Sequence, residues 1–250
     1  MKFGVMFSNV GPMGTPDFLP DFARMNEEEK RRIHREMVRE LESMKPSGWR
    51  DGRLAWHRAH SAADEQTPMA LLELANDLYQ RGRPEQAMDL FGRIETLNMP
   101  DARTNTLLAL SRGEVLDHLG QSEMAISALR AGKRLSQDLD DPELIGRALV
   151  LLGRVHHHQG DERRALLLAE EAVELLETED MSPFLPAALH LSANAYRMAG
   201  KPQSSDTAFK RCLHIARLQG NREYIARALG GQGVLLAEEG MLVQAAQHLE

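Results

Sequence analysis

Apolar residues recur every three or four positions along most of the chain, the spacing that places them on one face of an α-helix. From residue 68 onward these apolar segments come in pairs, and a glycine followed by a few polar residues separates the two members. The separating glycines follow one another after 38, 40, 40 and 40 residues; they are Gly82, Gly120, Gly160, Gly200 and Gly240. The pattern predicts five helix-turn-helix units near residues 68–105, 106–145, 146–185, 186–225 and 226–250, the last one incomplete.

Residue size repeats together with the glycines. The eighth position of each unit is small, and its occupants are Ala75, Gly113, Gly153, Ala193 and Gly233. The twentieth position is also small, and a larger apolar residue often stands at the twenty-fourth. Small residues at these places let the two helices of a unit approach closely, and the larger residue fills the remaining space.

Helix ends are marked by residue type. Each separating glycine suits the left-handed turn that closes a helix. Asp161, Pro84 and Pro202 follow such turns and suit the start of the second helix of their units.

These features resemble the tetratricopeptide repeat (TPR) family over residues 68–250. The resemblance implies an all-α, right-handed superhelical solenoid of about five repeats. The repeat of about 40 residues is longer than the usual 34, and such longer repeats resemble those of bacterial transcription regulators and kinesin light chains. An unrelated helical bundle with accidental periodicity is the alternative, and five concordant units argue against it.

Residues 26–67 are expected to cap the N-terminal end of the repeat array. Asn26 followed by Glu29 is a capping-box pattern that opens a helix over residues 26–44. Its expected apolar stripe consists of Ile33, Met37, Leu41 and Met44. A second short helix is expected over residues 54–63, anchored by Trp56.

The first 25 residues have a different pattern. Residues 3–7 indicate one short buried strand that leads into a loop rich in glycine and proline. Residues 1–17 weakly resemble the start of luciferase-like flavin monooxygenases. An (β/α)₈ barrel needs eight strands, and no second strand is predicted, so flavin chemistry does not follow. This segment is expected to be a separate strand and loop or to be disordered.

Charge and composition exclude several classes of function. The 250 residues carry a formal net charge of -7, which argues against direct nucleic-acid binding by this region. Cys212 is the single cysteine, so no disulfide framework exists and a reducing cytoplasm is expected. No apolar run approaches the roughly 20 residues that span a bilayer.

Candidate catalytic and metal sites are weak. His156, His157 and His158 are consecutive and therefore point in three directions on a helix, whereas metal-binding pairs need a spacing of four. His156 and Cys212 fall on inward-facing repeat positions and are interpreted as core residues. We expect no catalytic residues, no cofactor and no metal.

The resemblance implies that five positions on the first helix of each repeat line an inner groove. The partner-binding candidates at these positions are Asn76, Tyr79, Arg147, Arg154, His157, His190, Asn194, Arg197 and Arg227. Arginine can hold a carboxylate through two hydrogen bonds, and asparagine can bind a peptide backbone. The hypothesis is a protein- or peptide-binding scaffold for an acidic segment or a C-terminal carboxylate, anchored by Arg147, Arg154, Asn194 and Arg197. The alternative is that these charges keep the inner face wet or pair with carboxylates of neighbouring helices.

Two other roles stay open. The chain is expected to be a fragment, because the fifth unit stops at residue 250 before its second helix is complete. It would then be the sensory or regulatory part of a larger bacterial transcription regulator or signalling protein. Otherwise the open C-terminal end binds a partner or another copy. A relative of flavin monooxygenases is the remaining, less favoured alternative.

Overall fold

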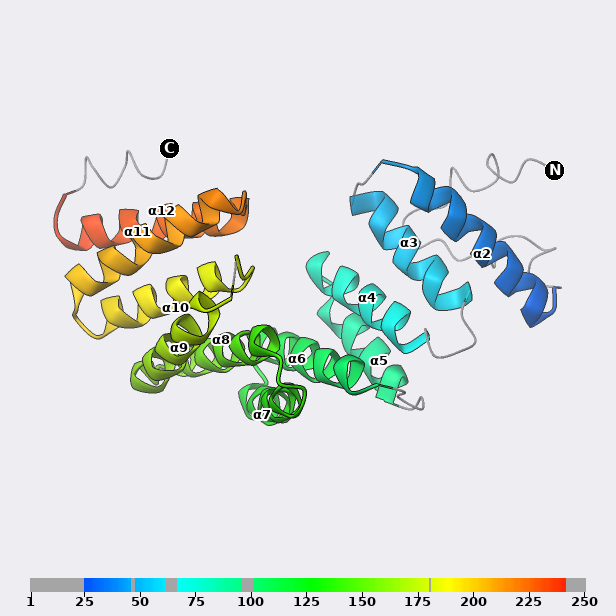
Figure 1. Cartoon of the computed structure of the whole chain (residues 1–250), viewed down its shortest axis with the longest axis horizontal. Coiled ribbons are helices and arrows are strands. Elements are labelled where there is room, and N and C mark those ends of the chain that lie inside the picture. The colour runs from blue at the N-terminus through cyan, green and yellow to red at the C-terminus, as the bar shows by residue number, and fades with distance from the viewer. Residues whose placement is uncertain (1–24, 46–47, 62–66, 96–100, 180, 242–250) are drawn as a thin grey trace. The chain divides into compact units, whose positions relative to one another are not determined.

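The chain folds into helices joined by short turns. The computed structural model describes residues 25–45, 48–61, 67–95, 101–179 and 181–241, and these contain no strand. They divide into two compact units, Met1–Thr104 and Asn105–Glu250, referred to below as unit 1 and unit 2. Figure 1 labels the helices: α2 (Glu27–Ser43), α3 (Gly48–Ser61), α4 (Thr67–Gln80), α5 (Pro84–Glu95), α6 (Ala102–His118), α7 (Ser122–Asp138), α8 (Pro142–His158), α9 (Glu162–Glu177), α10 (Leu185–Met198), α11 (Pro202–Leu218) and α12 (Arg222–Glu238).

The predicted glycine turns are confirmed. All five separating glycines adopt a positive φ, between 69° and 80°. At Gly160, the N–H of Asp161 donates to the carbonyl of His156 at 2.9 Å, a bond that closes the last turn of α8. Gly220 and Asp140 also have a positive φ, 67° and 51°, and they end second helices, a role the sequence analysis did not assign.

The predicted helix starts are also confirmed. Pro84 and Pro202 are the first residues of α5 and α11, and Asp161 accepts from the N–H of Arg164 at 3.2 Å. Asn26 and Glu29 form the complete capping box, each side chain 2.9 Å from the backbone nitrogen of the other residue.

The two N-terminal helices differ from expectation in detail. Met44 is not part of the buried stripe of α2, since it lies beyond the last helical residue and is 46% exposed, whereas His34 is buried in that stripe. Helix α3 begins at Gly48 rather than at residue 54. Tertiary contacts of α3 with α2 and α4 outweigh the low helix propensity of its two glycines.

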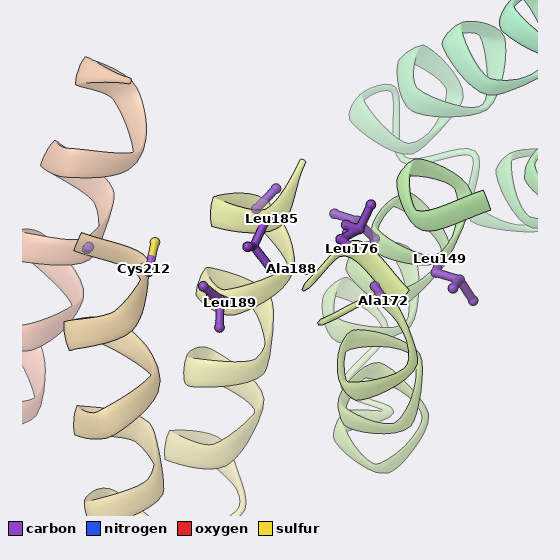
Figure 2. Packing of buried hydrophobic residues seen from close by; sticks show 10 residues of the cluster. Leu149, Ala172, Leu176, Leu185, Ala188, Leu189 and Cys212 are labelled. Carbon is purple, nitrogen blue, oxygen red and sulfur yellow. The ribbon is translucent and has the colours of Figure 1, made fainter. Parts of the chain in front are cut away.

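The core of unit 2 lies between its successive helices. Helix α9 contacts both α8 and α10, and Figure 2 shows Leu176 of α9 between Leu149 of α8 and Ala188 of α10. All three side chains are fully buried. The core therefore continues from one repeat to the next instead of closing within each hairpin, as in solenoid proteins.

Small residues create the close approaches that the repeat pattern predicted. A Cβ atom added to Gly113 would lie 2.5 Å from Leu129 Cγ, and one added to Gly231 would lie 2.3 Å from the Phe209 ring. Gly230 differs from these glycines, because no described atom lies within 4 Å of the position its Cβ would occupy.

Some sequence expectations fall outside the described residues. They are the strand over residues 3–7, the resemblance of residues 1–17 to flavin monooxygenases and the end of the fifth unit. Among the helices that the structure describes, none is long and apolar enough to span a bilayer.

Candidate functional site

The first helices of successive repeats in unit 2 are neighbours, and charged side chains connect them. Helix α10 contacts both α8 and α12. Arg154 of α8 donates from Nη1 to Glu114 Oε1 at 3.4 Å and from Nε to Asp117 Oδ2 at 3.1 Å, and both carboxylates belong to α6. Glu114 and Arg154 are 40 residues apart, so the ion pair joins the same position of two adjacent repeats.

Asp117 is the most enclosed charge of this network. Its side chain is only 3% exposed, and it holds Arg154 through one carboxylate oxygen and His158 Nδ1, at 3.0 Å, through the other. A buried carboxylate is tolerated only when cations and hydrogen bonds compensate for the lost water. Asp117 was not among the predicted partner-binding candidates, although it lies three residues after Glu114, which occupies the same repeat position as Arg154.

Arg147 is held in place in a similar manner. Its Nη2 lies 3.4 Å from Glu114 Oε2 and 3.4 Å from Ser111 Oγ. Its guanidinium also lies over the Phe184 ring, 5.7 Å from the centroid, in a cation–π arrangement. On the same helix, His157 Nδ1 lies 2.8 Å from Glu162 Oε2.

Helix α10 provides a histidine and an asparagine one turn apart. The His190 ring lies 5.9 Å from both the Phe209 and the Tyr224 rings. Burial, with smaller contributions from Arg227 and His157, lowers the pKa of His190 to about 4, so the ring is neutral at pH 7. Asn194 Nδ2 donates to the His190 carbonyl at 3.0 Å, and its Oδ1 has no partner among the described residues.

Two further arginines have carboxylate partners. Arg197 of α10 donates from Nη1 to Glu238 Oε1 of α12 at 2.6 Å, 41 residues away. Arg227 pairs with Glu223 at 2.9 Å within α12 and lies over the Tyr224 ring, 5.4 Å from its centroid. Arg197 uses only Nη1 in contacts with described residues, so its other nitrogens remain able to donate.

The predicted candidates therefore fall into two groups. Unit 2 contains seven of them on α8, α10 and α12, which we call the first-helix surface; they are Arg147, Arg154, His157, His190, Asn194, Arg197 and Arg227. Asn76 and Tyr79, both partly buried, lie on α4 of unit 1. Each arginine of the first-helix surface contacts a carboxylate, so the surface is less basic than its arginines alone suggest.

His156 and Cys212 are confirmed as core residues. His156 is 6% exposed, and burial lowers its pKa. Cys212 is fully buried, donates to the Pro186 carbonyl at 3.2 Å, and has a pKa raised to about 12 by burial. A thiol with so high a pKa is a poor nucleophile. In the ranges that the structure describes, no group of three or more histidine, cysteine, aspartate or glutamate side chains is placed to hold a metal ion.

A second surface of unit 2 contains a cavity, and it lacks the repeated ion pairs of the first-helix surface. A cavity of about 690 Å³ lies between α9 and α11, and α10 contributes Leu189, Ser192 and Tyr196 to its lining. Tyr196 donates to Glu170 and Arg211 pairs with Glu177, so both interactions connect helices across this cavity. The cavity lining also includes Glu174, which makes it more acidic than the first-helix surface.

Comparison with known proteins identifies the fold. No family model matches the sequence, and no curated protein matches it either. Solved structures do match. The Rap protein complexed with competence and sporulation factor is 12% identical with a TM-score of 0.65, over 89% of this chain and 69% of that one. PlcR of Bacillus thuringiensis, in complex with the peptide PapR7 and DNA, is 14% identical with a TM-score of 0.63, over 89% and 91%.

A third match is a signal transduction ATPase with numerous domains from Pyrococcus horikoshii, which has a tetratricopeptide repeat sensor. It is 16% identical with a TM-score of 0.63, over 93% of this chain and 41% of that chain. The chain thus has an all-α, TPR-like helical repeat fold. Repeat proteins of this kind present extended surfaces for interaction with other proteins.

Proposed function

We propose that unit 2 binds an extended peptide segment on its first-helix surface and holds a carboxylate of that segment, either a C-terminus or an acidic side chain. The observation that carries the proposal is the pair Asn194 and Arg197 on α10. Asn194 Oδ1 is available to accept from a peptide N–H, and Arg197 keeps donors beyond the one that Glu238 uses. Asn194 and Arg197 are three positions apart along the helix, so both side chains lie on one helical face.

The ion pairs on either side prepare this surface for binding. Arg147 and Arg154 are fixed by contacts from α6, and Arg197 by a contact from α12, so their side chains lose little freedom when a ligand arrives. Arg147 and Arg154 add positive potential beside the binding position, although Glu114 and Asp117 offset part of it. The proposed role is therefore recognition of a peptide, which the surface binds with moderate affinity and with a specificity that several polar contacts supply.

The structural neighbours support a peptide as the ligand. PlcR was solved in complex with a peptide, PapR7, and DNA, and the Rap protein was solved in complex with competence and sporulation factor. At sequence identities of 12% and 14%, the two structures show a similar fold but do not indicate the roles of individual residues. The proposed roles of Asn194 and Arg197 therefore depend on the geometry of this chain.

A sensory part within a larger signalling protein is a second candidate role. The observation that favours it is the match to an archaeal signal transduction ATPase, in which a tetratricopeptide repeat sensor accompanies other domains. Peptide binding by unit 2 would then be the input that the rest of such a protein reads.

The test compares peptides that differ only in their last group. Wild-type chain and an Arg197→Gln variant are titrated with a hexapeptide library, each peptide made with a free carboxylate and with a C-terminal amide, and binding is followed by fluorescence anisotropy. We expect carboxylate peptides to bind at least tenfold more tightly than amides to the wild type, and this preference to disappear in Arg197→Gln.

An exposed arginine on another helix provides the matched control. Arg163 lies in α9, is exposed and has no partner among the described residues. Arg163→Gln removes the same charge and should leave the carboxylate preference unchanged. If wild type binds carboxylates and amides equally, or if Arg163→Gln has the same effect as Arg197→Gln, the proposal is wrong. Preference for basic peptides would direct attention to the acidic cavity between α9 and α11.

Arg154 is less suited to this test. Its replacement removes a cation from the buried Asp117 carboxylate, so any loss of binding could follow from a loss of folding.

A further inference from the structure

A groove follows the gap between α9 and α11, and α10 forms its floor. Helix α10 contacts both of these helices, and Figure 2 shows Leu189 of α10 between Leu176 of α9 and Cys212 of α11. The cavity of about 690 Å³ described above is one part of the groove, and a cavity of about 700 Å³ is the other. Glu177 and Arg211 line both cavities, so the two parts adjoin at this ion pair. We call the two cavities together the second-helix groove.

The floor of the second-helix groove is apolar. Val173 and Leu189 line the first cavity, and Leu185 and Ile215 line the second. Met181, which also lines the second cavity, is 51% exposed. A ligand that covers these side chains with apolar groups of its own gains the free energy of removing apolar surface from water.

The second cavity lies beside an irregular turn of the fourth repeat. Helix α10 begins at Leu185, whereas a start equivalent to those of α8 and α12 would be at residue 182. Met181 in this turn has a positive φ of 57°. In the turns before α8 and α12, the positive φ occurs one repeat position earlier, at Asp140 and Gly220. This end of the groove is therefore specific to the fourth repeat.

Hydrogen bonds hold the irregular turn and the walls of the groove in place. Gln219 Nε2, directly after α11, donates to the Ser182 carbonyl at 2.8 Å. Across the first cavity, Tyr196 of α10 donates to Glu170 of α9. These contacts form the groove before any ligand arrives, so little ordering cost opposes binding.

Helix α9 gives the groove a wall of carboxylates. Glu170, Glu174 and Glu177 line the first cavity, and their spacing of four and then three residues places them on one helical face. Glu170 accepts from Tyr196, and Glu177 pairs with Arg211. Glu174 is exposed and has no partner among the described residues.

The cations that line the groove are already paired. Lys210 lies 2.6 Å from Asp206 within α11, and Arg211 is paired with α9 as described above. Glu179 lines the second cavity and, like Glu174 in the first, has no side-chain partner within the described part of the chain. The groove therefore keeps a negative charge that a cationic side chain of a ligand would neutralise.

We propose that the second-helix groove docks a segment of a partner protein that is rich in basic and apolar residues. Its apolar side chains cover the floor, and a lysine or arginine lies against Glu174. This ligand is opposite in charge to the peptide of the first-helix surface, so the proposal does not depend on the proposed function. Lining residues of α11 extend from Gln203 to Ile215, about 18 Å along the helix. A segment of that length contains about five extended residues or about twelve helical ones.

Three peptides of about twelve residues test the chemistry of the ligand. Each is acetylated and amidated, so none has a terminal carboxylate. The first combines leucine with lysine, the second replaces every lysine by glutamate, and the third replaces every leucine by serine. Fluorescence anisotropy measures their affinities for the wild-type chain. We expect the leucine–lysine peptide to bind about tenfold more tightly than either other peptide, because glutamate meets like charges and serine buries little apolar surface.

Glu174→Lys tests the charge of the groove. It reverses an exposed charge that has no partner in the ranges that the structure describes, so the fold should be retained. It should weaken binding of the leucine–lysine peptide by about tenfold, because repulsion replaces attraction. Glu36→Lys is the matched control, since Glu36 is an exposed residue of α2 that likewise has no described partner. This control changes the net charge equally and should keep the wild-type affinity.

Thr207→Trp tests the shape of the groove. Thr207 is exposed and lines the first cavity, so a tryptophan there occupies the cavity without entering the core. Binding of the leucine–lysine peptide should fall by about tenfold as its apolar contacts are lost. Circular dichroism establishes that the helices are retained. Arg197→Gln should bind this peptide as tightly as the wild type does, which separates this test from that of the proposed function.

Other results would overturn the proposal. If the wild type binds no leucine–lysine peptide, or binds the serine–lysine peptide equally well, the groove does not select a basic and apolar segment. If Glu36→Lys weakens binding as much as Glu174→Lys, the net charge of the chain accounts for the affinity. If Glu174→Lys or Thr207→Trp keeps the wild-type affinity, the peptide binds elsewhere. If the wild type self-associates and Thr207→Trp does not, while no peptide binds, the groove serves a second copy of the chain.

Discussion

The two units treat their buried polar groups in opposite ways. In unit 1, His34 of α2 and His57 of α3 lie with their Nδ1 atoms 2.9 Å apart, and their side chains are 4% and 2% exposed. Burial disfavours a charge on His57, and His34, Arg53 and His60 add to this effect. In unit 2, the buried Asp117 carboxylate has two side-chain partners, the Arg154 guanidinium and His158 Nδ1.

The two units also differ in the sequence separation between paired polar residues, and in unit 2 this separation follows the length of the repeat. The histidine pair of unit 1 joins residues 23 positions apart and occurs once. Several pairs of unit 2 join residues 37 to 41 positions apart, so they connect the first helices of adjacent repeats. Unit 1 is consequently expected to respond more strongly to protons than unit 2, in which His190 has the smaller shift, and unit 2 is expected to respond to the removal of individual charges.

The largest expected effect is acid destabilisation of unit 1. Burial, with smaller contributions from His34, Arg53 and His60, lowers the pKa of His57 from 6.5 to about 3. The folded pKa lies below the unfolded value, so the stability from neutral His57 is complete above pH 6.5 and is lost as the pH falls toward 3. The loss approaches roughly 5 kcal/mol at the acid limit.

Tryptophan fluorescence measures this effect in unit 1 alone, because both tryptophans, Trp49 and Trp56, lie in α3. Trp56 stacks on His60 with centroids 4.2 Å apart, so its emission should change as α3 detaches. Replacing His57 by glutamine should remove most of the pH dependence between 6.5 and 3. The exposed His214 of unit 2 gives the control His214→Gln, which should preserve it. Equal acid curves for the wild type and His57→Gln would contradict the assignment.

The second effect is the loss of one partner of a buried charge in unit 2. Arg154→Met should destabilise unit 2 by about 3 kcal/mol, because the buried Asp117 carboxylate loses its guanidinium partner and keeps only the contact with His158 Nδ1. The combination of Asp117→Asn with Arg154→Met should recover most of this loss, since no buried charge remains. Hydrogen exchange resolved by residue measures both variants and separates unit 2 from unit 1. Additive effects of the two substitutions would show that the pair is not coupled.

Alanine substitutions at two glycines of unit 2 should change the stability of the unit by smaller amounts and in opposite directions. Gly113→Ala should destabilise the unit by about 1–3 kcal/mol, because its Cβ would lie 2.5 Å from Leu129 Cγ and 3.3 Å from the Leu129 nitrogen. Gly230→Ala should stabilise it by up to about 1 kcal/mol through helix propensity alone. Urea unfolding followed by circular dichroism tests both signs. Destabilisation by Gly230→Ala would mean that its surroundings are closed.

The smallest effect concerns the first helix of unit 1. Asn26→Ala removes the bond that the Asn26 side chain accepts from the Glu29 N–H, keeps the bond from the residue 26 N–H to the Glu29 side chain, and should cost about 1 kcal/mol. Hydrogen exchange should increase in α2 while α8 to α12 keep their protection. A similar increase in both units would indicate that they unfold together.

Much of the fold could be predicted from residue spacing because local chemistry determines helix ends. A glycine with positive φ at Gly160 and a side-chain cap at Asp161 both depend on nearby residues, and both were found from the sequence. The start of α3 was placed six residues late, because contacts with α2 and α4 stabilise a segment whose own propensity is weak.

The candidate site could be predicted only in part. The period identified Arg154 and Arg197 as residues of first helices, and pairing with neighbouring carboxylates was one of the two interpretations left open. The burial of Asp117 and the contact between His34 and His57 depend on the relative rotation of packed helices, which spacing along one helix does not determine. The identity of the peptide depends on a partner and leaves still less trace in the sequence.

The ion pair between Glu114 and Arg154 has a consequence for how the chain avoids misfolding. Repeats of nearly equal length can in principle pack against the wrong neighbouring repeat, so that one repeat is skipped or two are exchanged. The ninth residues of the successive repeats are Asn76, Glu114, Arg154, Asn194 and Val234, so only the second and third repeats present opposite charges there. A repeat packed out of order would leave the Asp117 carboxylate buried without Arg154. The free-energy cost of that unpaired charge favours the correct order of the repeats.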